Sequence, residues 1–277
     1  MTTDPLGADS RHGLAQPPGR QPSRIGIAEV EKSFAAASGV TRAVERVSLD
    51  VAPGEFVALL GPSGCGKTTL LNLVAGLIFP DRGEVHYAGQ RVTRPNGQTG
   101  YLTQDDALLP WRTVAANVGL PLEIKRIDKA ERMRRTGEIL HRVGLAGFER
   151  HFPHQVSGGM RKRVSLARTL VYQPETLLLD EPFGALDAQT KILMQRELLS
   201  IVRQLDLTVL LVTHDLDEAI ALADRVILFS RRPATIIETI KLKRRTPEQV
   251  GQRVGKDDKI YDQIWQRLAL EITEVRQ

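Results

Sequence analysis

The sequence predicts an α/β protein with a mostly parallel sheet and helices on both of its faces. Short, uniformly apolar runs alternate with helical stretches, which is typical of strands that are buried on both faces. The segment 61–69, Gly-Pro-Ser-Gly-Cys-Gly-Lys-Thr-Thr, lies between such a strand and a helix. Sheets of this kind bind their ligands beyond the carboxyl ends of the strands, so we expect the functional residues at that edge.

The elements can be placed in order along the chain. Alternation of apolar and polar residues predicts half-buried strands at Ile25–Glu31 and Val47–Val51. A fully apolar strand at 56–60 precedes the glycine-rich segment, and residues 70–77 continue as a helix. The remaining predicted strands are 84–87, 99–102, 176–179, 208–212 and 224–229, and the helical stretches are 113–172 and 190–205.

The two ends of the chain differ from this pattern. Residues 1–24 are rich in Pro, Gly and Gln and have few apolar residues, so we expect a disordered tail. Past Pro247 the chain is polar, and then apolar residues recur every four positions, which predicts an amphipathic C-terminal helix. These residues are Ile260, Ile264, Leu268 and Ile272, with Tyr261, Trp265 and Val275 beside them.

Composition limits the class of protein. A chain of 277 residues, 42% hydrophobic and 26% charged, suits one large globular domain or a domain with an appendage. No apolar run reaches the ~18 residues of a membrane span, and the first residues lack the core of a signal peptide. We therefore expect the chain to stay in the cytoplasm, and the single cysteine, Cys65, which excludes an internal disulfide, fits such a reducing compartment. The net charge of +5 permits an anionic partner, but the basic residues are spread out, as on a solvated surface.

The glycine-rich segment fits G-x-x-x-x-G-K-[ST], a phosphate-binding loop. Its glycines let successive N–H groups point at phosphate oxygens, and the helix start adds partial positive charge. Lys67 is expected to reach the β- and γ-phosphates, and the Thr68 hydroxyl to bind Mg²⁺. The alternative, a glycine-rich turn that matches by accident, agrees less well with the strand–loop–helix context. The expected nucleotide-binding residues are Gly61, Pro62, Ser63, Gly64, Cys65, Gly66, Lys67, Thr68 and Thr69.

Two further motifs carry chemistry. The strand 176–179 ends in Asp180 and Glu181, which suits Mg²⁺ binding by Asp180 and a general base at Glu181; the alternative is two solvated acids. Ser157-Gly158-Gly159 opens another helix, with Ser157 as its N-cap, and forms a second anion-binding helix start. Because one loop already serves the nucleotide, this second cradle suggests a second nucleotide held by a second copy of the protein.

The order of these motifs over about residues 25–240 resembles the ATP-binding cassette (ABC) ATPases. The matching segments are 61–69 (Walker A), Gln104 (Q-loop), 156–160 (signature), 177–181 (Walker B), 185–187 (D-loop) and 213–215 (H-loop). The resemblance implies a P-loop NTPase (RecA-like) core over 25–243, with an antiparallel β subdomain and a helical subdomain inserted at about 105–172, and a C-terminal extension over 244–277. It also implies a head-to-tail homodimer with two MgATP between Walker A of one copy and the signature of the other.

The resemblance also implies roles for single residues. Phe34 would stack on adenine, and the alternative is a core phenylalanine. Gln104 would touch Mg²⁺ or the attacking water and couple the site to a partner. His214 would bond the γ-phosphate and position the water, and Asp187 would cross the dimer interface. The chain has Val156 and Lys162 where Leu and Gln are usual. Having Lys instead of Gln at position 162 can alter the rate of ATP turnover.

The segments 106–114, 180–190 and 230–236 look like those of the nitrate/sulfonate/taurine-type importer ATPases, although 230–236 departs from their usual Pro-Gly-Arg-Ile sequence. They imply a peripheral subunit on the cytoplasmic face of the inner membrane. It would serve a separate permease and, indirectly, a periplasmic or extracellular solute-binding protein. The segment with Trp111 would face the permease; the alternative is that Trp111 is core.

Two other functions stay open: a soluble ABC ATPase acting on nucleic acid or the ribosome, and the cassette of iron–sulfur assembly. The first usually has two cassettes or a long coiled coil. This chain has one cassette, no heptad run and only 5% aromatic residues, so no nucleic-acid partner is expected. The transported solute is not specified here, because a permease and a binding protein select it.

Overall fold

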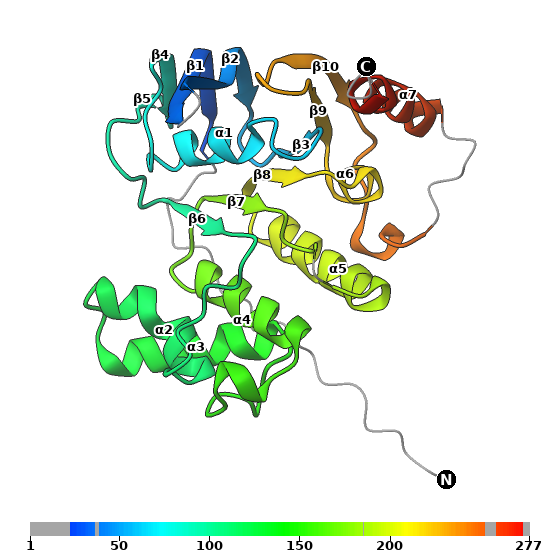
Figure 1. The fold of residues 1–277 in the computed structure, drawn as a ribbon. Helices are drawn as coiled ribbons and strands as arrows, with labels where there is room; N and C mark the ends of the chain where they lie inside the picture. Colours follow the sequence, from blue (N-terminus) through cyan, green and yellow to red (C-terminus); the bar gives the residue numbers. More distant parts are fainter. Residues whose placement is uncertain (1–22, 37–38, 185, 253–258, 274–277) are drawn as a thin grey trace.

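A computed structural model describes residues 23–36, 39–184, 186–252 and 259–273. The chain forms a six-stranded central sheet, a smaller antiparallel sheet and a helical lobe (Figure 1). The α/β fold predicted from the sequence is confirmed. Within the described ranges, no helix has the length and apolar character required to cross a membrane.

The central sheet has the strand order β10-β9-β3-β8-β7-β6, in which all neighbours are parallel except the edge strand β10. Every residue of β3, β7 and β8 is buried, as their uniformly apolar sequences predict. The carboxyl ends of these three strands therefore lie side by side. The strands are β3 (Phe56–Leu60), β6 (Thr99–Leu102), β7 (Thr176–Asp180), β8 (Thr208–Thr213), β9 (Arg225–Phe229) and β10 (Ile236–Lys241).

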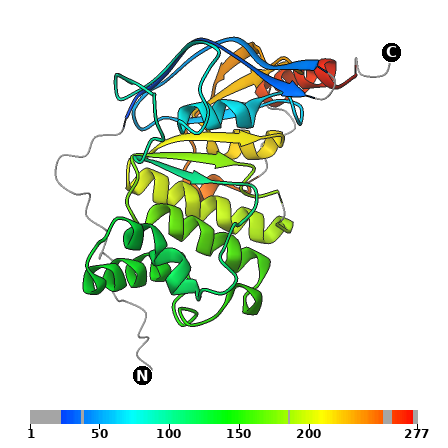
Figure 2. The same ribbon diagram turned by 60° about the vertical axis from the view of Figure 1, so that its left-hand side comes forward.

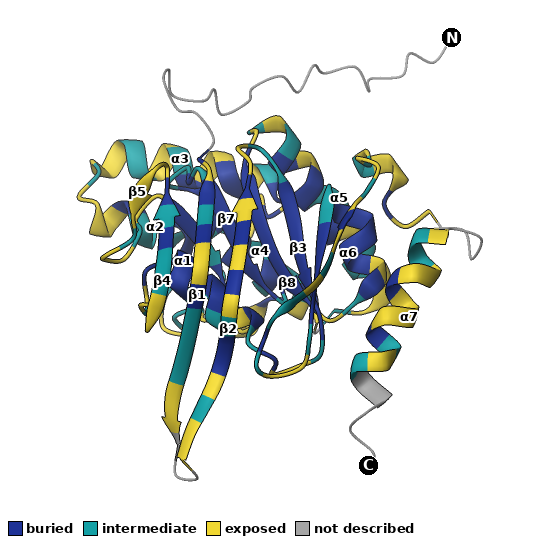
Figure 3. Cartoon of the chain, turned by 90° about the horizontal axis from the view of Figure 1, so that it is seen from above, coloured by how far each residue is buried: buried dark blue, intermediate teal, exposed yellow. Residues whose placement is uncertain are grey.

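The second sheet is antiparallel and has the order β2-β1-β4-β5. Its strands are β1 (Ile25–Ala36), β2 (Gly39–Val51), β4 (Arg82–Tyr87) and β5 (Gln90–Arg91). The predicted bounds of the first two strands were too short. Their outer halves pair with each other but project past the core, so their residues are largely exposed and lack the expected alternation (Figure 3).

The helices divide between the two faces of the central sheet. Helix α1 lies between the two sheets, whereas α4, α5 and α6 cover the other face, and α2 and α3 pack beside α4 (Figures 1 and 2). Alternate residues of the central strands thus enter two separate apolar cores. The helices are α1 (Lys67–Val74), α2 (Val114–Ile124), α3 (Lys129–Arg142), α4 (Gly158–Leu170), α5 (Ala188–Gln204), α6 (Leu216–Leu222) and α7 (Lys259–Thr273), with 3-10 turns at Pro153–Gln155 and Pro247–Gln249.

Helix α1 ends three residues before the predicted end at residue 77. Gly76 follows it with φ of +69°, and a Cβ there would lie 2.2 Å from the carbonyl oxygen of Arg94. The backbone of the 94–96 segment thus approaches too closely for any side chain, and Asn96 N donates to Ala75 O at 2.9 Å. This tertiary contact ends the helix, which the apolar run itself did not reveal.

The predicted C-terminal helix is confirmed as α7. Ile264 and Leu268 are buried against the core, whereas Trp265 is 55% exposed. Val275 and the side chain of Ile272 lie outside the described residues. Of the predicted tail, residues 1–22 lie outside the description, and the last two have defined contacts: Ser23 is buried and donates to Glu175, and Arg24 pairs with Asp50.

Candidate functional site

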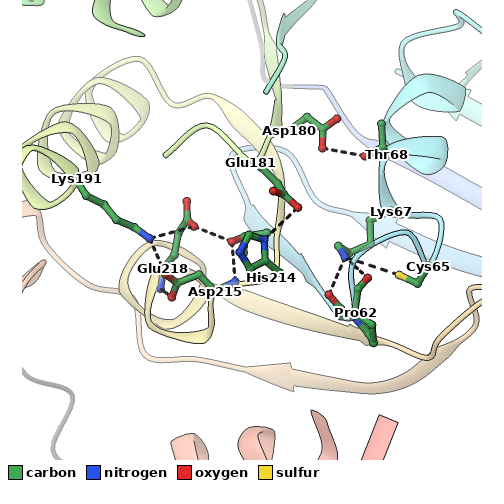
Figure 4. A network of polar contacts seen from close by, with 12 residues as sticks. Pro62, Cys65, Lys67, Thr68, Asp180, Glu181, Lys191, His214, Asp215 and Glu218 are labelled. Atoms are coloured by element: carbon green, nitrogen blue, oxygen red, sulfur yellow. Dashed lines mark hydrogen bonds and ion pairs between the residues drawn. The ribbon is translucent and has the colours of Figure 1, made fainter. Parts of the chain in front are cut away.

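The loop between β3 and α1 holds its lysine in a buried position. Lys67 is 4% exposed, and its ammonium donates to the carbonyl oxygens of Gly61 and Pro62, both at 2.7 Å. The Cys65 sulfur lies 3.8 Å from the same nitrogen (Figure 4). Among the side chains that the structure describes, Lys67 has no acidic partner. A buried cation whose partners are neutral carbonyl oxygens and a sulfur is matched to an incoming anion.

Close packing requires glycine in this loop. A Cβ on Gly66, whose φ is +129°, would lie 2.4 Å from the carbonyl oxygen of Ala43 on β2. Gly64 also has a positive φ, +72°, and its carbonyl accepts two hydrogen bonds from the Arg232 guanidinium. The loop is thus clamped between β2 and the β9–β10 connection, with the curled backbone that a phosphate cradle needs.

Thr68 and Asp180 meet at the carboxyl end of β7. The Thr68 hydroxyl donates to Asp180 Oδ1 at 3.0 Å, although the two residues are 112 positions apart. Asp180 is 8% exposed. Burial raises the pKa of its carboxyl, the negative charge of Glu181 adds to this, and the Thr68 hydrogen bond partly opposes it. A buried carboxylate and a hydroxyl side by side are oxygen ligands that suit Mg²⁺.

Glu181 and His214 form a second pair beside this one. The Glu181 carboxylate lies 3.1 Å from His214 Nδ1, and the imidazole is about half exposed (Figure 4). Glu181 has φ of +45°, an uncommon value for a non-glycine residue, while its N–H donates to Val212 O of β8 at 2.9 Å. Unusual backbone geometry of this kind is often found at functional sites, and here it turns the carboxylate toward the histidine.

Lys67, Thr68 and Glu181 line one open cavity of about 390 Å³. Asp180 and His214 are not among its lining residues and are connected to it through their contacts with Thr68 and Glu181. The cavity extends from the phosphate loop to Phe34, whose ring is 41% exposed at the cavity edge. The interpretation of Phe34 as a core residue is therefore wrong, because a core ring would be buried. The cavity is lined by Phe34, Thr41, Ala43, Gly64, Gly66, Lys67, Thr68, Thr69, Glu181, Val212 and Arg232.

The outer side of the same loop borders a different hollow of about 740 Å³ beneath α7. Gly61, Pro62, Ser63 and Cys65 line it together with His214. Cys65 is only 1% exposed despite this position. The structure therefore places the nine predicted loop residues on two sides of one turn rather than around a single pocket.

The remaining predicted residues do not line the nucleotide cavity. Ser157 is the N-cap of α4, as expected, and accepts from the Met160 N–H at 3.2 Å. Gly158 and Gly159 open that helix, and Asp187 caps α5 in the same way through Thr190 N at 3.0 Å. None of these residues lines the cavity of its own chain.

Gln104 has an exposed side chain, and its carbonyl accepts a 2.6 Å hydrogen bond from Lys162. Lys162 is 4% exposed and also lies 3.4 Å from Asp106. Lys162, which stands where Gln is usual, thus joins the first half of α4 to the segment after β6. Gln104 does not reach Asp180 or Thr68 through any described contact.

Sequence reasoning missed several residues at this site. Thr41, Ala43, Val212 and Arg232 line the cavity but were not among the predicted site residues, although Arg232 lies in the segment 230–236 that resembles the importer ATPases. Arg232 lies 168 positions from the glycine that it contacts, so only the folded chain reveals the pair. The local signal for Arg232 as a site residue was weak: it is a basic residue that follows the predicted buried strand 224–229.

The fold and the site define a P-loop nucleoside triphosphatase with two carboxylates at the sheet edge. The ABC transporter family model matches residues 44–184. The taurine import ATP-binding protein TauB of Yersinia pestis is 48% identical over 216 residues, which are 78% of this chain and 82% of that protein. The aliphatic sulfonates import ATP-binding protein SsuB of Bacillus cereus is 42% identical over 219 residues, covering 79% and 86%.

Solved structures agree with this assignment. A dimeric ATP-binding cassette in a post-hydrolysis state, bound to ADP and Pi, is 31% identical and has a TM-score of 0.71, covering 80% of this chain and 100% of that one. Among the sequence relatives, an uncharacterized ABC transporter ATP-binding protein of Methanocaldococcus jannaschii is 43% identical over 82% of this chain and 85% of its own length. The chain belongs to the ABC transporter family of ATP-binding proteins, and it is an ATPase of that family.

Proposed function

We propose that this ABC ATPase is the energising subunit of a membrane importer for taurine- or sulfonate-type solutes. The observation that supports the catalytic part is the arrangement of Lys67, Thr68 and Glu181 along one cavity, with Asp180 bonded to Thr68 and His214 paired with Glu181. The importer part is supported by the similarity to proteins of taurine and aliphatic sulfonate import. Nitrate is a further candidate solute of the same type.

The residues at the loop fit MgATP. Lys67 would exchange its two carbonyl partners for phosphate oxygens, and Phe34 would offer its exposed ring to the adenine. Thr68 and Asp180 would hold Mg²⁺, and Gln104 is the further residue proposed to touch the cation or the attacking water. When bound, the cation neutralises charge on the phosphates, which lowers the barrier to hydrolysis. A buried Asp180, whose charge is disfavoured by burial, gains from a cation beside it.

The second pair would activate water. Glu181 would accept the proton of the attacking water as a general base, since its carboxylate is already oriented by His214. His214 would then bond the γ-phosphate and keep the water in place. Because the two residues stand on neighbouring strand ends, β7 and β8, their spacing is set by the parallel register of the sheet.

A second copy of the chain would complete the site. Ser157, Gly158 and Gly159 form a helix start that does not line the cavity of its own chain. In a head-to-tail homodimer that helix start would face the nucleotide of the other copy, and Asp187 would cross the interface. The solved relative that is dimeric supports this arrangement.

The permease would bind near Trp111, which is 72% exposed, so the interpretation of Trp111 as core is wrong. Leu108 packs against the apolar core beside it. We further propose an ATPase domain at 25–243, a helical subdomain at about 105–172 and a C-terminal extension at 244–277. The protein would sit on the cytoplasmic face of the inner membrane, with the solute-binding protein acting indirectly through the permease.

Reconstitution tests the importer assignment. The chain would be purified with a candidate taurine- or sulfonate-type permease of the same organism and placed in proteoliposomes, with the solute-binding protein on the opposite side. We expect ATP hydrolysis to rise when taurine or an alkanesulfonate is added, and the Lys67→Ala variant to show no such rise. If the chain instead co-purifies with RNA or with iron–sulfur scaffold proteins, and no added solute changes its turnover, the importer assignment is wrong.

A further inference from the structure

A compact polar cluster lies behind His214, away from the nucleotide cavity. Lys191, in the first turn of α5, donates to Asp215 Oδ2 at 2.6 Å and lies 3.8 Å from Glu218 Oε2 (Figure 4). The Thr213 hydroxyl donates to the same Glu218 oxygen at 2.7 Å. The three ionic groups are 22%, 33% and 4% exposed, so water screens them only in part.

The cluster holds the backbone turn that carries His214. The N–H of Asp215 donates to Thr213 Oγ1 at 3.0 Å, and Asp215 Oδ1 caps α6 by accepting from the Glu218 N–H at 3.1 Å. Residues 213 and 215 are therefore fixed on both sides of His214. Among the contacts described for this turn, the hydrogen bond from the Lys191 side chain is the one that comes from α5.

Lys191 also stands one turn after Asp187, the N-cap of α5, and its own N–H donates to Asp187 O at 2.8 Å. The lysine thus joins the start of α5 to the turn that presents the histidine. Two carboxylates converge on it, so its charge balances them. Burial disfavours the charge on Asp215, but the hydrogen bond from Lys191 and backbone donors outweigh burial and lower the pKa of that carboxyl.

We propose that Lys191 is a positioning residue for ATP hydrolysis, which braces the 213–215 turn against α5 and thereby holds His214 in register with Glu181. This inference rests on the ATPase activity. Lys191 does not line the nucleotide cavity, so its removal leaves nucleotide binding intact. Displacing a catalytic group by about 1 Å lowers turnover by up to 10²-fold, and a loosened turn acts on turnover in the same way.

The test compares steady-state kinetics of the wild type, Lys191→Met and Lys191→Arg, with the exposed Lys129→Met as control. We expect Lys191→Met to lower kcat roughly tenfold or more while KM for ATP changes by less than about twofold. Lys191→Arg, which keeps the charge and a donor, should recover most of kcat. Lys129→Met should match the wild type in both constants.

A pH profile of kcat, measured together with the Tm of each variant at the same pH values, separates positioning from a loss of general stability. Without the ammonium, Glu218 faces Asp215, His214 and the Thr213 hydroxyl, and the Tyr261 hydroxyl of α7 is within electrostatic range of Asp217 and Asp215. Two uncompensated carboxylates repel each other, so the kcat defect of Lys191→Met should be larger at pH 8 than at pH 6, where Glu218 takes up a proton.

An unchanged kcat in Lys191→Met overturns the inference. So does a loss that Lys191→Arg does not repair and that is the same at both pH values, because that pattern indicates unfolding alone. A wild type with no ATPase activity would instead reject the catalytic site itself, so the two failures are distinguishable.

Discussion

Glu218 makes protein stability depend on pH near neutrality. Its side chain is 4% exposed, and burial raises the pKa of the carboxyl from 4.5 to about 7, although the Thr213 hydroxyl and Lys191 partly oppose this. The folded state therefore holds a proton that the unfolded chain releases at lower pH. Stability from this group is fully present below about pH 4.5 and is lost as the pH rises through about 7.

The magnitude follows from the two pKa values. A gap between 4.5 and about 7, at roughly 1.4 kcal/mol per pH unit, corresponds to about 3 kcal/mol, of which about 2 kcal/mol falls between pH 5.5 and pH 8. Glu218→Gln keeps the shape and an oxygen that accepts from Thr213, but it cannot ionise. We expect the variant to lose less stability than the wild type over that pH range, by about 2 kcal/mol.

The assay is chemical or thermal denaturation at pH 5.5 and pH 8. For a chain of this size, 2 kcal/mol corresponds to roughly 4–8 °C in Tm. Asp217→Asn, an exposed acid in the same helix, is the control and should follow the wild-type profile. Parallel profiles for wild type and Glu218→Gln would refute the reasoning.

Three further predictions concern the site and its surroundings. Lys67→Ala should weaken ATP binding at least tenfold in a fluorescent-nucleotide titration, because the buried cation is lost; unchanged affinity would contradict its role. Trp111→Ala should leave Tm within about 1–2 °C, since the ring is 72% exposed, but weaken permease association by about 2 kcal/mol; unchanged permease affinity would defeat the anchor role. Alkylation of Cys65, which is 1% exposed, should be slow in the native protein and fast in denaturant, and rapid native labelling that ATP blocks would favour a reactive thiol instead.

Local patterns predicted much of the fold. The phosphate loop, the buried strands and the Ser157 N-cap each depend on residues close together in sequence, so their positions could be read directly. Helix α7 was also predictable, because the four-residue spacing of Ile264 and Leu268 matches the face that is buried. Asp180 and Glu181 were identified by the apolar strand that precedes them.

Long-range contacts were not predictable in this way. The early end of α1 depends on the backbone near Arg94, and the clamp on Gly64 comes from Arg232. Nothing in the local sequence marks Lys191 within the predicted helix 190–205, and its contact with Asp215 follows only from the fold. In each case the partner lies between about 20 and 170 positions away, and no local periodicity encodes such a pairing.

The most direct test of the proposed catalytic site is phosphate release by the Glu181→Gln variant with MgATP. The change keeps the size of the side chain but removes the base beside His214. We expect ATP affinity close to that of the wild type, hydrolysis slower by roughly 10²- to 10⁴-fold, and an ATP-bound dimer that accumulates on size-exclusion chromatography. Near-normal hydrolysis by a correctly folded Glu181→Gln protein would contradict the assignment of Glu181, and with it the chemistry proposed for the site.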